Sequence, residues 1–243
     1  GTLLGTMPLG VNRQPYVLLY DGQYLWANFR DGPDLIQIDP VRAAFLSNRP
    51  VQSGSAEMLF DGTYLWITSP DQNAVTRFLP RQGIVDQTFS TGFNKPRSLA
   101  HDGTYLWVGN LETSLMVRYR PFEMERVDDF STRGGEPWEM LYVNGDIWVT
   151  LPQQNVVLKF RASDRTLYGE FPTRGAQPRG IAWDGRSVWV TNYGDSTVAR
   201  LRPADASVQE VIRVGRGPEK VLFDGTYIWV RNSQDGPVPR IRP

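Results

Sequence analysis

Two short series of side chains along the chain combine the residue types that bind or transform polar ligands. The first series consists of the residues that follow a proline at the start of each expected inner strand: Tyr16, Arg97, Trp138, Arg179 and Glu219. Ala56 holds the equivalent position in the one strand that lacks this proline. The second series comes one residue later: Val17, Glu57, Ser98, Glu139, Gly180 and Lys220. Gathered on one axis, they would form a mixed cluster of carboxylates, cations and aromatic rings.

These residue types allow several kinds of chemistry. Arg97 and Arg179 can clamp a carboxylate through two parallel hydrogen bonds, or they can pair with the glutamates and neutralise the cluster. Glu57, Glu139 and Glu219 are oxygen ligands of the kind that calcium and magnesium prefer. Neighbouring cations oppose binding of another cation and also lower a carboxylate pKa, which disfavours acid–base work. We therefore expect no cofactor, with calcium or magnesium at these glutamates as the alternative.

Trp138 has no explanation in the repeat described below, because six of the eight tryptophans are the repeat residue and Trp183 fills another repeated aromatic place. An exposed indole beside a carboxylate suits stacking on a sugar, a peptide side chain or a cation. The alternative is a hydrophobic stopper that fills the central axis. Loops between second and third strands add Tyr193 and Arg231, the loop residues that least resemble turn formers.

The elements that would position these residues come from a regular repeat. Blocks such as YDGQYLW, FDGTYLW and WDGRSVW end on tryptophans spaced by 40, 41, 41, 41 and 40 residues: Trp26, Trp66, Trp107, Trp148, Trp189 and Trp229. The fifth copy predicts strands at 180–183, 187–191, 197–201 and 208–214, with Asp184-Gly185 as a two-residue hairpin turn. Polarity rises from the first strand to the fourth, as expected where inner strands are buried between neighbouring sheets.

Four strands in each of six copies predict an all-β, six-bladed β-propeller of four-stranded antiparallel blades. The last copy stops after its third strand, and Leu3–Met7 supplies the missing fourth, so the N-terminal strand is expected to join the C-terminal blade and close the ring. We predict a single domain over 1–243, with blades at about 15–50, 51–92, 93–134, 135–175, 176–215 and 216–243 plus the closing strand 1–9.

A second regularity is a column of polar side chains in the third strands: Gln37, Arg77, Arg118, Lys159, Arg200 and Arg240. Because it recurs in nearly every copy, we interpret it as structural and expect these cations to pair with an aspartate of a neighbouring blade.

Composition narrows the range of partners. Lys+Arg 26 balance Asp+Glu 26, so the concentrated positive charge that nucleic-acid binding needs is missing. No run approaches the roughly 20 apolar residues of a membrane span, so we expect no membrane insertion. Cysteine is absent, which excludes disulfides, thiolate zinc sites and cysteine nucleophiles. Nothing at the N-terminus has the pattern of a signal peptide.

The blocks FDGTYLWITSPDQNAVTRFLP and WDGRSVWVTNYGDSTVARLRP resemble the YVTN-type propeller repeats of bacterial surface and exported proteins and the related repeats of virginiamycin B lyase. The resemblance covers all six copies and implies an exported or periplasmic protein. In the lyase branch it implies histidine and glutamate on the central face with a magnesium ion. The only histidine here, His101, stands in the repeated aromatic place before Asp-Gly, so that chemistry has no matching residue.

From these residues we expect a monomeric binding module, rather than an enzyme, that uses the channel mouth to bind a small polar ligand, a glycan or a protein segment. The predicted ligand-binding residues are Tyr16, Glu57, Arg97, Trp138, Glu139, Arg179, Glu219, Lys220, Tyr193 and Arg231. One alternative is a lyase or hydrolase of the virginiamycin B lyase-like class that uses carboxylates and a divalent metal. The other is a structural interaction platform without a ligand.

Overall fold

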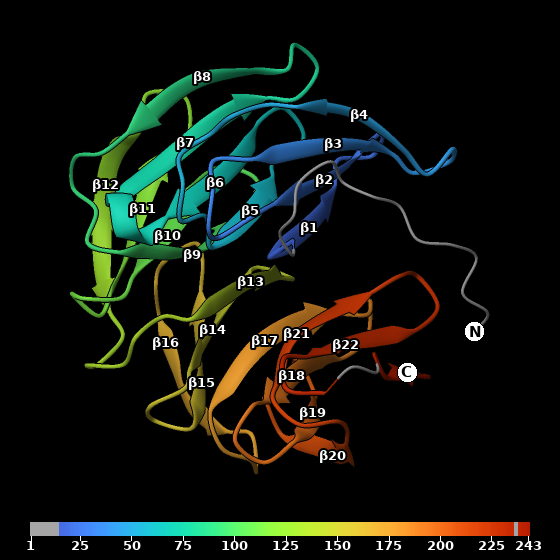
Figure 1. Ribbon diagram of the computed structural model, residues 1–243. Coiled ribbons are helices and arrows are strands. Elements are labelled where there is room, and N and C mark those ends of the chain that lie inside the picture. Colours follow the sequence, from blue (N-terminus) through green and yellow to red (C-terminus); the bar gives the residue numbers. More distant parts are fainter. Residues whose placement is uncertain (1–14, 236–237) are drawn as a thin grey trace. The chain divides into compact units, whose positions relative to one another are not determined.

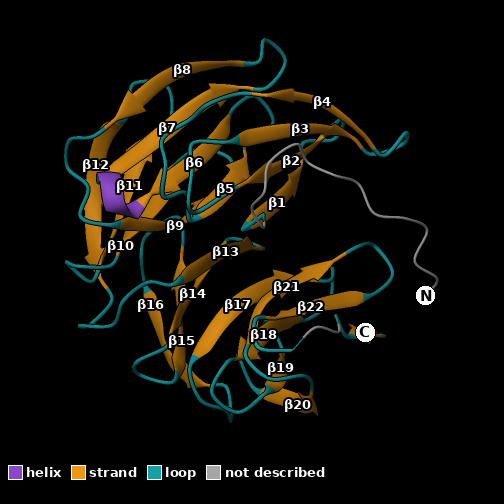
Figure 2. Ribbon diagram, viewed as in Figure 1, coloured by secondary structure: helices purple, strands orange, loops and turns teal. Residues whose placement is uncertain are grey.

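The computed structural model describes residues 15–235 and 238–243. Its regular structure is antiparallel strand throughout, apart from one helical turn among these residues, η1 (Pro70–Gln72) (Figure 2). No helix of the described part has the length and apolar character that a membrane span needs. The chain divides into two compact units, one ending at Leu99 and the other comprising Ala100–Pro243, so the predicted organisation as one domain stays a prediction.

Strands follow one another in simple up-and-down order within each sheet (Figure 1). The first sheet contains β1 (Val17–Tyr20), β2 (Leu25–Asn28), β3 (Leu35–Asp39) and β4 (Ala44–Asn48). The second contains β5 (Glu57–Phe60), β6 (Leu65–Ser69), β7 (Ala74–Leu79) and β8 (Ile84–Phe89). The third contains β9 (Pro96–His101), which begins in the first unit, and β10 (Leu106–Asn110), β11 (Leu115–Arg120) and β12 (Glu125–Ser131).

The second unit continues the pattern with three more sheets. The fourth contains β13 (Glu139–Val143), β14 (Asp146–Leu151), β15 (Val156–Arg161) and β16 (Leu167–Pro172). The fifth contains β17 (Pro178–Trp183), β18 (Val188–Asn192), β19 (Thr197–Leu201) and β20 (Val208–Arg213). The last has three strands among the described residues: β21 (Pro218–Phe223), β22 (Ile228–Asn232) and β23 (Arg240–Ile241). The predicted closing strand, residues 1–9, lies outside the described part.

The repeated Asp-Gly pair organises the turn between first and second strands. In the fifth sheet one oxygen of Asp184 accepts the backbone N–H groups of Arg186 and Ser187, and the other accepts the indole N–H of Trp189 at 2.7 Å. The expected two-residue hairpin is wrong here, because Trp183 pairs with Val188 and four residues lie between them. A carboxylate that satisfies three donors holds this longer turn, and only the glycine takes a positive φ.

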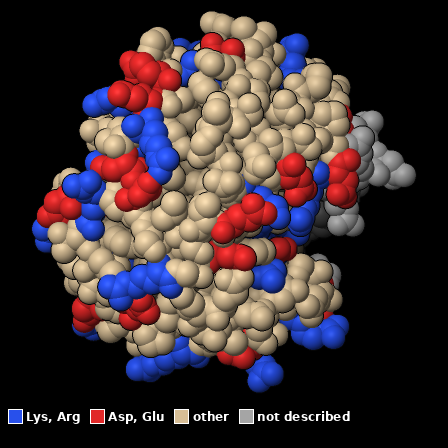
Figure 3. Space-filling view, turned by 90° about the vertical axis from the view of Figure 1, so that its left-hand side faces the viewer, with Lys and Arg blue, Asp and Glu red and all other residues tan. Residues whose placement is uncertain are grey.

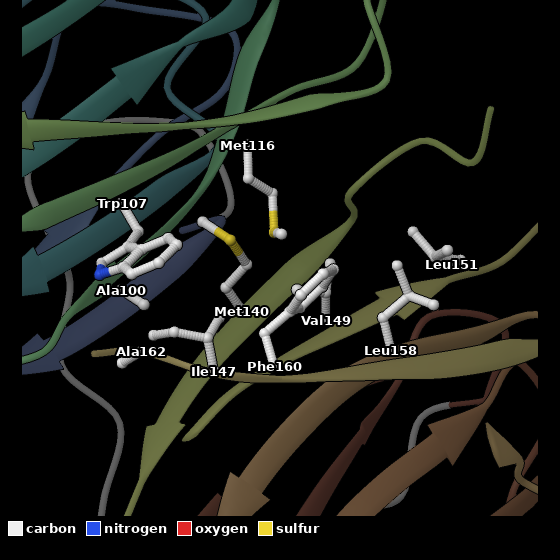
Figure 4. Packing of buried hydrophobic residues seen from close by; sticks show 10 residues of the cluster. All are labelled: Ala100, Trp107, Met116, Met140, Ile147, Val149, Leu151, Leu158, Phe160 and Ala162. Atoms are coloured by element: carbon white, nitrogen blue, oxygen red, sulfur yellow. The ribbon is translucent and has the colours of Figure 1, made fainter. Parts of the chain in front are cut away.

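Four repeat tryptophans pack into the core between their own sheet and the next: Trp26, Trp107, Trp148 and Trp189. Trp107 lies with Met116 against Met140, Ile147 and Phe160 of the fourth sheet, and Figure 4 shows these side chains facing one another. Trp26, Trp107 and Trp148 are fully buried. Replacing one such indole by alanine costs about 3–5 kcal/mol, because neighbouring strands relax only partly into the cavity.

Fourth strands are the most exposed, which confirms the polarity gradient: every residue of β8 is exposed or only partly buried.

The polar column in the third strands is also structural, but its partners differ from the expected ones. Arg77 donates to Asp86 at 2.6 Å and Arg118 to Asp128 at 2.7 Å, and each aspartate lies on the adjacent strand of the same sheet. The expectation of pairs between blades is therefore wrong for these two arginines. Their alkyl chains and guanidinium groups reach over the sheet's own tryptophan, with Arg77 5.7 Å from the ring of Trp66.

Candidate functional site

The start of the innermost strands forms the candidate site in the second unit. Figure 1 shows β13, β17 and β21 side by side. Gly180 permits this close approach on β17, because a Cβ there would lie 2.9 Å from the carbonyl oxygen of Glu219 and 2.9 Å from the Cα of Lys220. A glycine in the second series is thus a packing requirement, and it brings residues of β21 up to Arg179.

Arg179 is the centre of this cluster. Its guanidinium lies over the ring of Tyr193, 3.5 Å from the centroid, and over the ring of Trp138 at 4.7 Å. Two aromatic faces therefore fix a planar cation that is four-fifths buried. Its Nη1 donates to Glu219 at 3.4 Å, and its Nε–H is buried with no hydrogen-bond partner among the described residues. A buried charged donor in that state has the capacity for one more acceptor.

The remaining charges pair in a chain that crosses three sheets. Glu219 accepts from Arg179 through one oxygen and from Arg231 at 3.3 Å through the other. Lys220 Nζ lies 2.9 Å from an oxygen of Glu139, which joins β21 to β13 across the intervening strand. Each of the two carboxylates thus faces at least one cation. Pairing of arginine with glutamate, one of the two expected alternatives, is present at Arg179.

A shallow hollow of about 170 Å³ borders the cluster, lined by Glu136, Trp138, Pro152, Gln153, Gln177 and Arg179. Trp138 is half-buried and forms part of its wall. Tyr193 is held from the other side, because its hydroxyl accepts the amide N–H of Gln234 at 2.9 Å. On the face that Figure 3 shows, basic and acidic side chains lie next to one another.

Thr150 on β14 positions three members of the site, and the sequence analysis did not identify it. Its hydroxyl accepts the backbone N–H of Glu139 at 3.1 Å and donates to the carbonyl oxygen of Arg179 at 2.7 Å. Its own carbonyl accepts the N–H of Trp138 at 3.0 Å. The repeat contains a signal for this role, because the position two residues after the repeat tryptophan is threonine in three copies. The residues at this position are Asn28, Thr68, Gly109, Thr150, Thr191 and Arg231.

The first unit contains the other three predicted site residues. Arg97 is buried and donates to the hydroxyl of Tyr16 at 3.2 Å. Thr68 repeats the role of Thr150, since its hydroxyl accepts the N–H of Glu57 at 3.1 Å and donates to the carbonyl of Arg97 at 2.8 Å. The structure therefore brings Tyr16, Glu57 and Arg97 together in one unit and the seven other predicted residues together in the second.

Within residues 15–235 and 238–243, no three acidic or histidine side chains gather as a metal site would require. Glu139 and Glu219, the two acidic site residues of the second unit, each face a cation. His101 is the last residue of β9, at the Asp-Gly turn, where the sequence analysis placed it.

No protein-family model and no curated protein sequence matches this chain. Solved structures do. Virginiamycin B lyase from Staphylococcus aureus aligns with a TM-score of 0.80 at 15% identity, over 93% of this chain and 80% of that one. A catalytically inactive variant of that lyase, solved with quinupristin, gives 0.77 at 13% identity, over 94% and 84% of the two chains.

A functionally unknown protein from Desulfotomaculum acetoxidans gives a TM-score of 0.74 at 13% identity, over 87% of this chain and 73% of that one. Identities this low carry information about the fold and not about the activity. The all-β chain described here has the six-bladed β-propeller fold of virginiamycin B lyase.

Proposed function

We propose that this protein is a binding module that takes a small polar ligand carrying a carboxylate group at the Trp138–Arg179–Tyr193 cluster. The observation that carries the proposal is the state of Arg179: a guanidinium held between two aromatic rings, with a buried Nε–H that has no acceptor among the described residues. A carboxylate is the group that a guanidinium edge binds through two parallel hydrogen bonds.

The surroundings support an anionic group over a cationic one. Both carboxylates of the cluster are already engaged by Lys220, Arg179 and Arg231. An incoming cation would have to displace one of these ion pairs, whereas an incoming carboxylate can bind the Nε–H of Arg179. The exposed part of the Trp138 ring can then contact the apolar part of the same ligand.

Binding is favoured over turnover by the same contacts. The two glutamates are ion-paired, and the sole histidine lies at the turn end of β9. The lyase variant solved with quinupristin holds a ligand on the same fold, and that ligand belongs to the lyase. The support for this chain comes from its own arginine.

The proposal is tested on protein labelled with ¹⁵N at arginine, in which each Nε–H gives a separate NMR signal. We expect acetate, N-acetylglycine, glucuronate or citrate to shift the Arg179 signal saturably at millimolar concentrations, whereas N-acetylglycinamide leaves it in place. The signal is assigned with Arg179→Lys. Trp138→Ala should weaken the binding about tenfold, which corresponds to about 1.4 kcal/mol.

Trp183→Phe is the matched control, because Phe60 and Phe223 occupy the same repeated position in other copies. It should leave the titration unchanged. If none of the carboxylates shifts Arg179, or if the uncharged amide shifts it equally, the cluster is not a carboxylate site and the proposal fails.

A further inference from the structure

The fourth copy differs from the other five at the turn between its first and second strands. In the others an aspartate accepts the indole N–H of the repeat tryptophan at 2.6–2.8 Å: Asp21, Asp61, Asp102, Asp184 and Asp224. In the fourth copy Val143 pairs with Asp146, which leaves Asn144-Gly145 as a two-residue turn with positive φ at both positions. The indole N–H of Trp148 is buried without an acceptor among the described residues.

This shorter turn borders a large hollow. About 620 Å³ lies between the third and fourth sheets, lined chiefly by polar groups and by Tyr105, Tyr142 and Tyr168. A second hollow of about 410 Å³ shares Asn144, Asp146 and Tyr168 with it. Together they form what we name the tyrosine groove, which is defined by Tyr105, Tyr142, Asn144, Asp146, Arg161 and Tyr168. It lies at the opposite end of β13 from Glu139, so it is separate from the carboxylate site proposed above.

Most of the groove wall is already fixed. The hydroxyl of Tyr168 accepts the Nε–H of Arg161 at 3.0 Å, and Lys159 Nζ lies 4.7 Å from its ring. Arg118 lies 4.4 Å from the ring of Tyr105. Asp146 pairs with Lys159 at 3.0 Å. Such a wall loses little conformational freedom on binding, which favours affinity.

Two groups in the groove stay available. Tyr142 is 38% exposed, and its register with Ile147 places it where Tyr20 stands against Leu25 in the first sheet. The side-chain amide of Asn144 is exposed. One is a flat aromatic surface, and the other offers a donor and an acceptor together.

We infer that the tyrosine groove binds an oligosaccharide. Sugar rings present flat C–H faces that pack on tyrosine, and their hydroxyl groups both donate and accept, which matches amide, carboxylate and guanidinium side chains. The 620 Å³ hollow has the volume of a small-molecule site, within the roughly 300–1,000 Å³ that such sites occupy. The lining of this hollow contains no aliphatic side chain larger than that of Ala162, and the second hollow adds only Val143, Pro203 and Ala204, so the groove offers few apolar contacts for the anchors of a peptide.

The test is a titration of the whole chain with four trisaccharides: maltotriose, cellotriose, laminaritriose and N,N′,N″-triacetylchitotriose. Saturation-transfer NMR and calorimetry measure the binding. We expect at least one to bind saturably, and Tyr142→Ala to weaken it at least tenfold. Asn144→Gly removes the amide without straining a positive φ and should weaken binding about threefold or more.

Tyr20→Ala is the matched control, because Tyr20 holds the same register position at 58% exposure and lines none of the described hollows. It should bind the sugar as the unchanged protein does. The inference is overturned if no trisaccharide binds, if Tyr142→Ala and Tyr20→Ala weaken binding equally, or if a peptide library yields ligands that need Tyr142 while the sugars do not bind. Because Arg179 lies outside the groove, Arg179→Lys should leave sugar binding intact, which keeps this result independent of the carboxylate site.

Discussion

Replacing Thr150 by valine removes a single hydroxyl that joins two strands of the candidate site. That hydroxyl accepts from Glu139 N–H and donates to the carbonyl of Arg179, and Thr150 is fully buried. Valine has nearly the same shape, so the change isolates the two hydrogen bonds from packing. Each lost bond leaves a backbone group unsatisfied at a cost of about 1–3 kcal/mol, which gives about 2–6 kcal/mol for the pair. A loss of that size lowers the melting temperature of a chain this long by roughly 4–24 °C.

Calorimetry and urea unfolding measure this loss. Thr150→Ser retains the hydroxyl and should cost at most about 1.5 kcal/mol, since it removes only a methyl group. Thr63→Val, at an exposed turn position, should change stability by less than about 0.5 kcal/mol. The reasoning is refuted if valine at position 150 costs no more than serine, because the hydroxyl would then contribute nothing.

Three further predictions concern other contacts. Gly180→Ala should destabilise the protein by about 1–3 kcal/mol and weaken carboxylate binding, because its Cβ would lie 2.9 Å from backbone atoms of Glu219 and Lys220. Urea unfolding measures the first effect and the Arg179 titration measures the second. A substitution that changes neither contradicts the close approach of the strands. Hydrogen bonds from the Trp229 indole and the turn backbone hold the pKa of Asp224 below its ordinary value of 3.8, so its contribution to stability is present above that value and is lost as pH falls through the folded-state pKa. Asp224→Asn should therefore be less stable than the unchanged protein near neutral pH, and the difference should shrink as the pH falls through the folded-state pKa of Asp224. A deficit in urea unfolding that does not change with pH would exclude this origin. Deletion of residues 1–9 should lower the melting temperature strongly if they form the closing strand, and an unchanged melting temperature would count against ring closure.

The sequence was sufficient for the parts of the fold that repeat. Tryptophans at spacings of 40 or 41 residues predicted six sheets, and the strand 197–201 of the fifth copy appears with those limits. Repetition makes such features recognisable in the sequence, because equivalent positions of each sheet pack against the same kind of neighbour and therefore carry similar residues. The stop of the last copy after a third strand was visible for the same reason.

The sequence did not predict features that depend on a change of one residue in the length of a turn, or on which rotamer a side chain adopts. The fourth copy is one residue shorter at its turn, and the register shows that Tyr142 occupies the position of Tyr20, which the sequence analysis did not identify. The aspartate partners of Arg77 and Arg118 lie within the sheet because these long side chains turn toward the adjacent strand. Neither outcome follows from residue type.

The candidate site was predictable in membership but not in contacts. Trp138, Arg179 and Glu219 were selected because they start equivalent strands, and the structure brings them together in the second unit. That Arg179 stacks on Tyr193, and that Lys220 reaches Glu139, depends on how far neighbouring strands approach at Gly180. Thr150 was missed because threonine is an ordinary strand residue, and only its hydrogen bonds distinguish it.

A crystal structure of the protein soaked with N-acetylglycine tests the account most directly, because it locates the ligand atoms. The proposed site predicts carboxylate oxygens within about 3.2 Å of the Arg179 guanidinium, with the rest of the ligand against the Trp138 ring. The account is contradicted if density for N-acetylglycine lies only elsewhere, and none lies at the Arg179 guanidinium, at a soaking concentration that saturates the protein in solution.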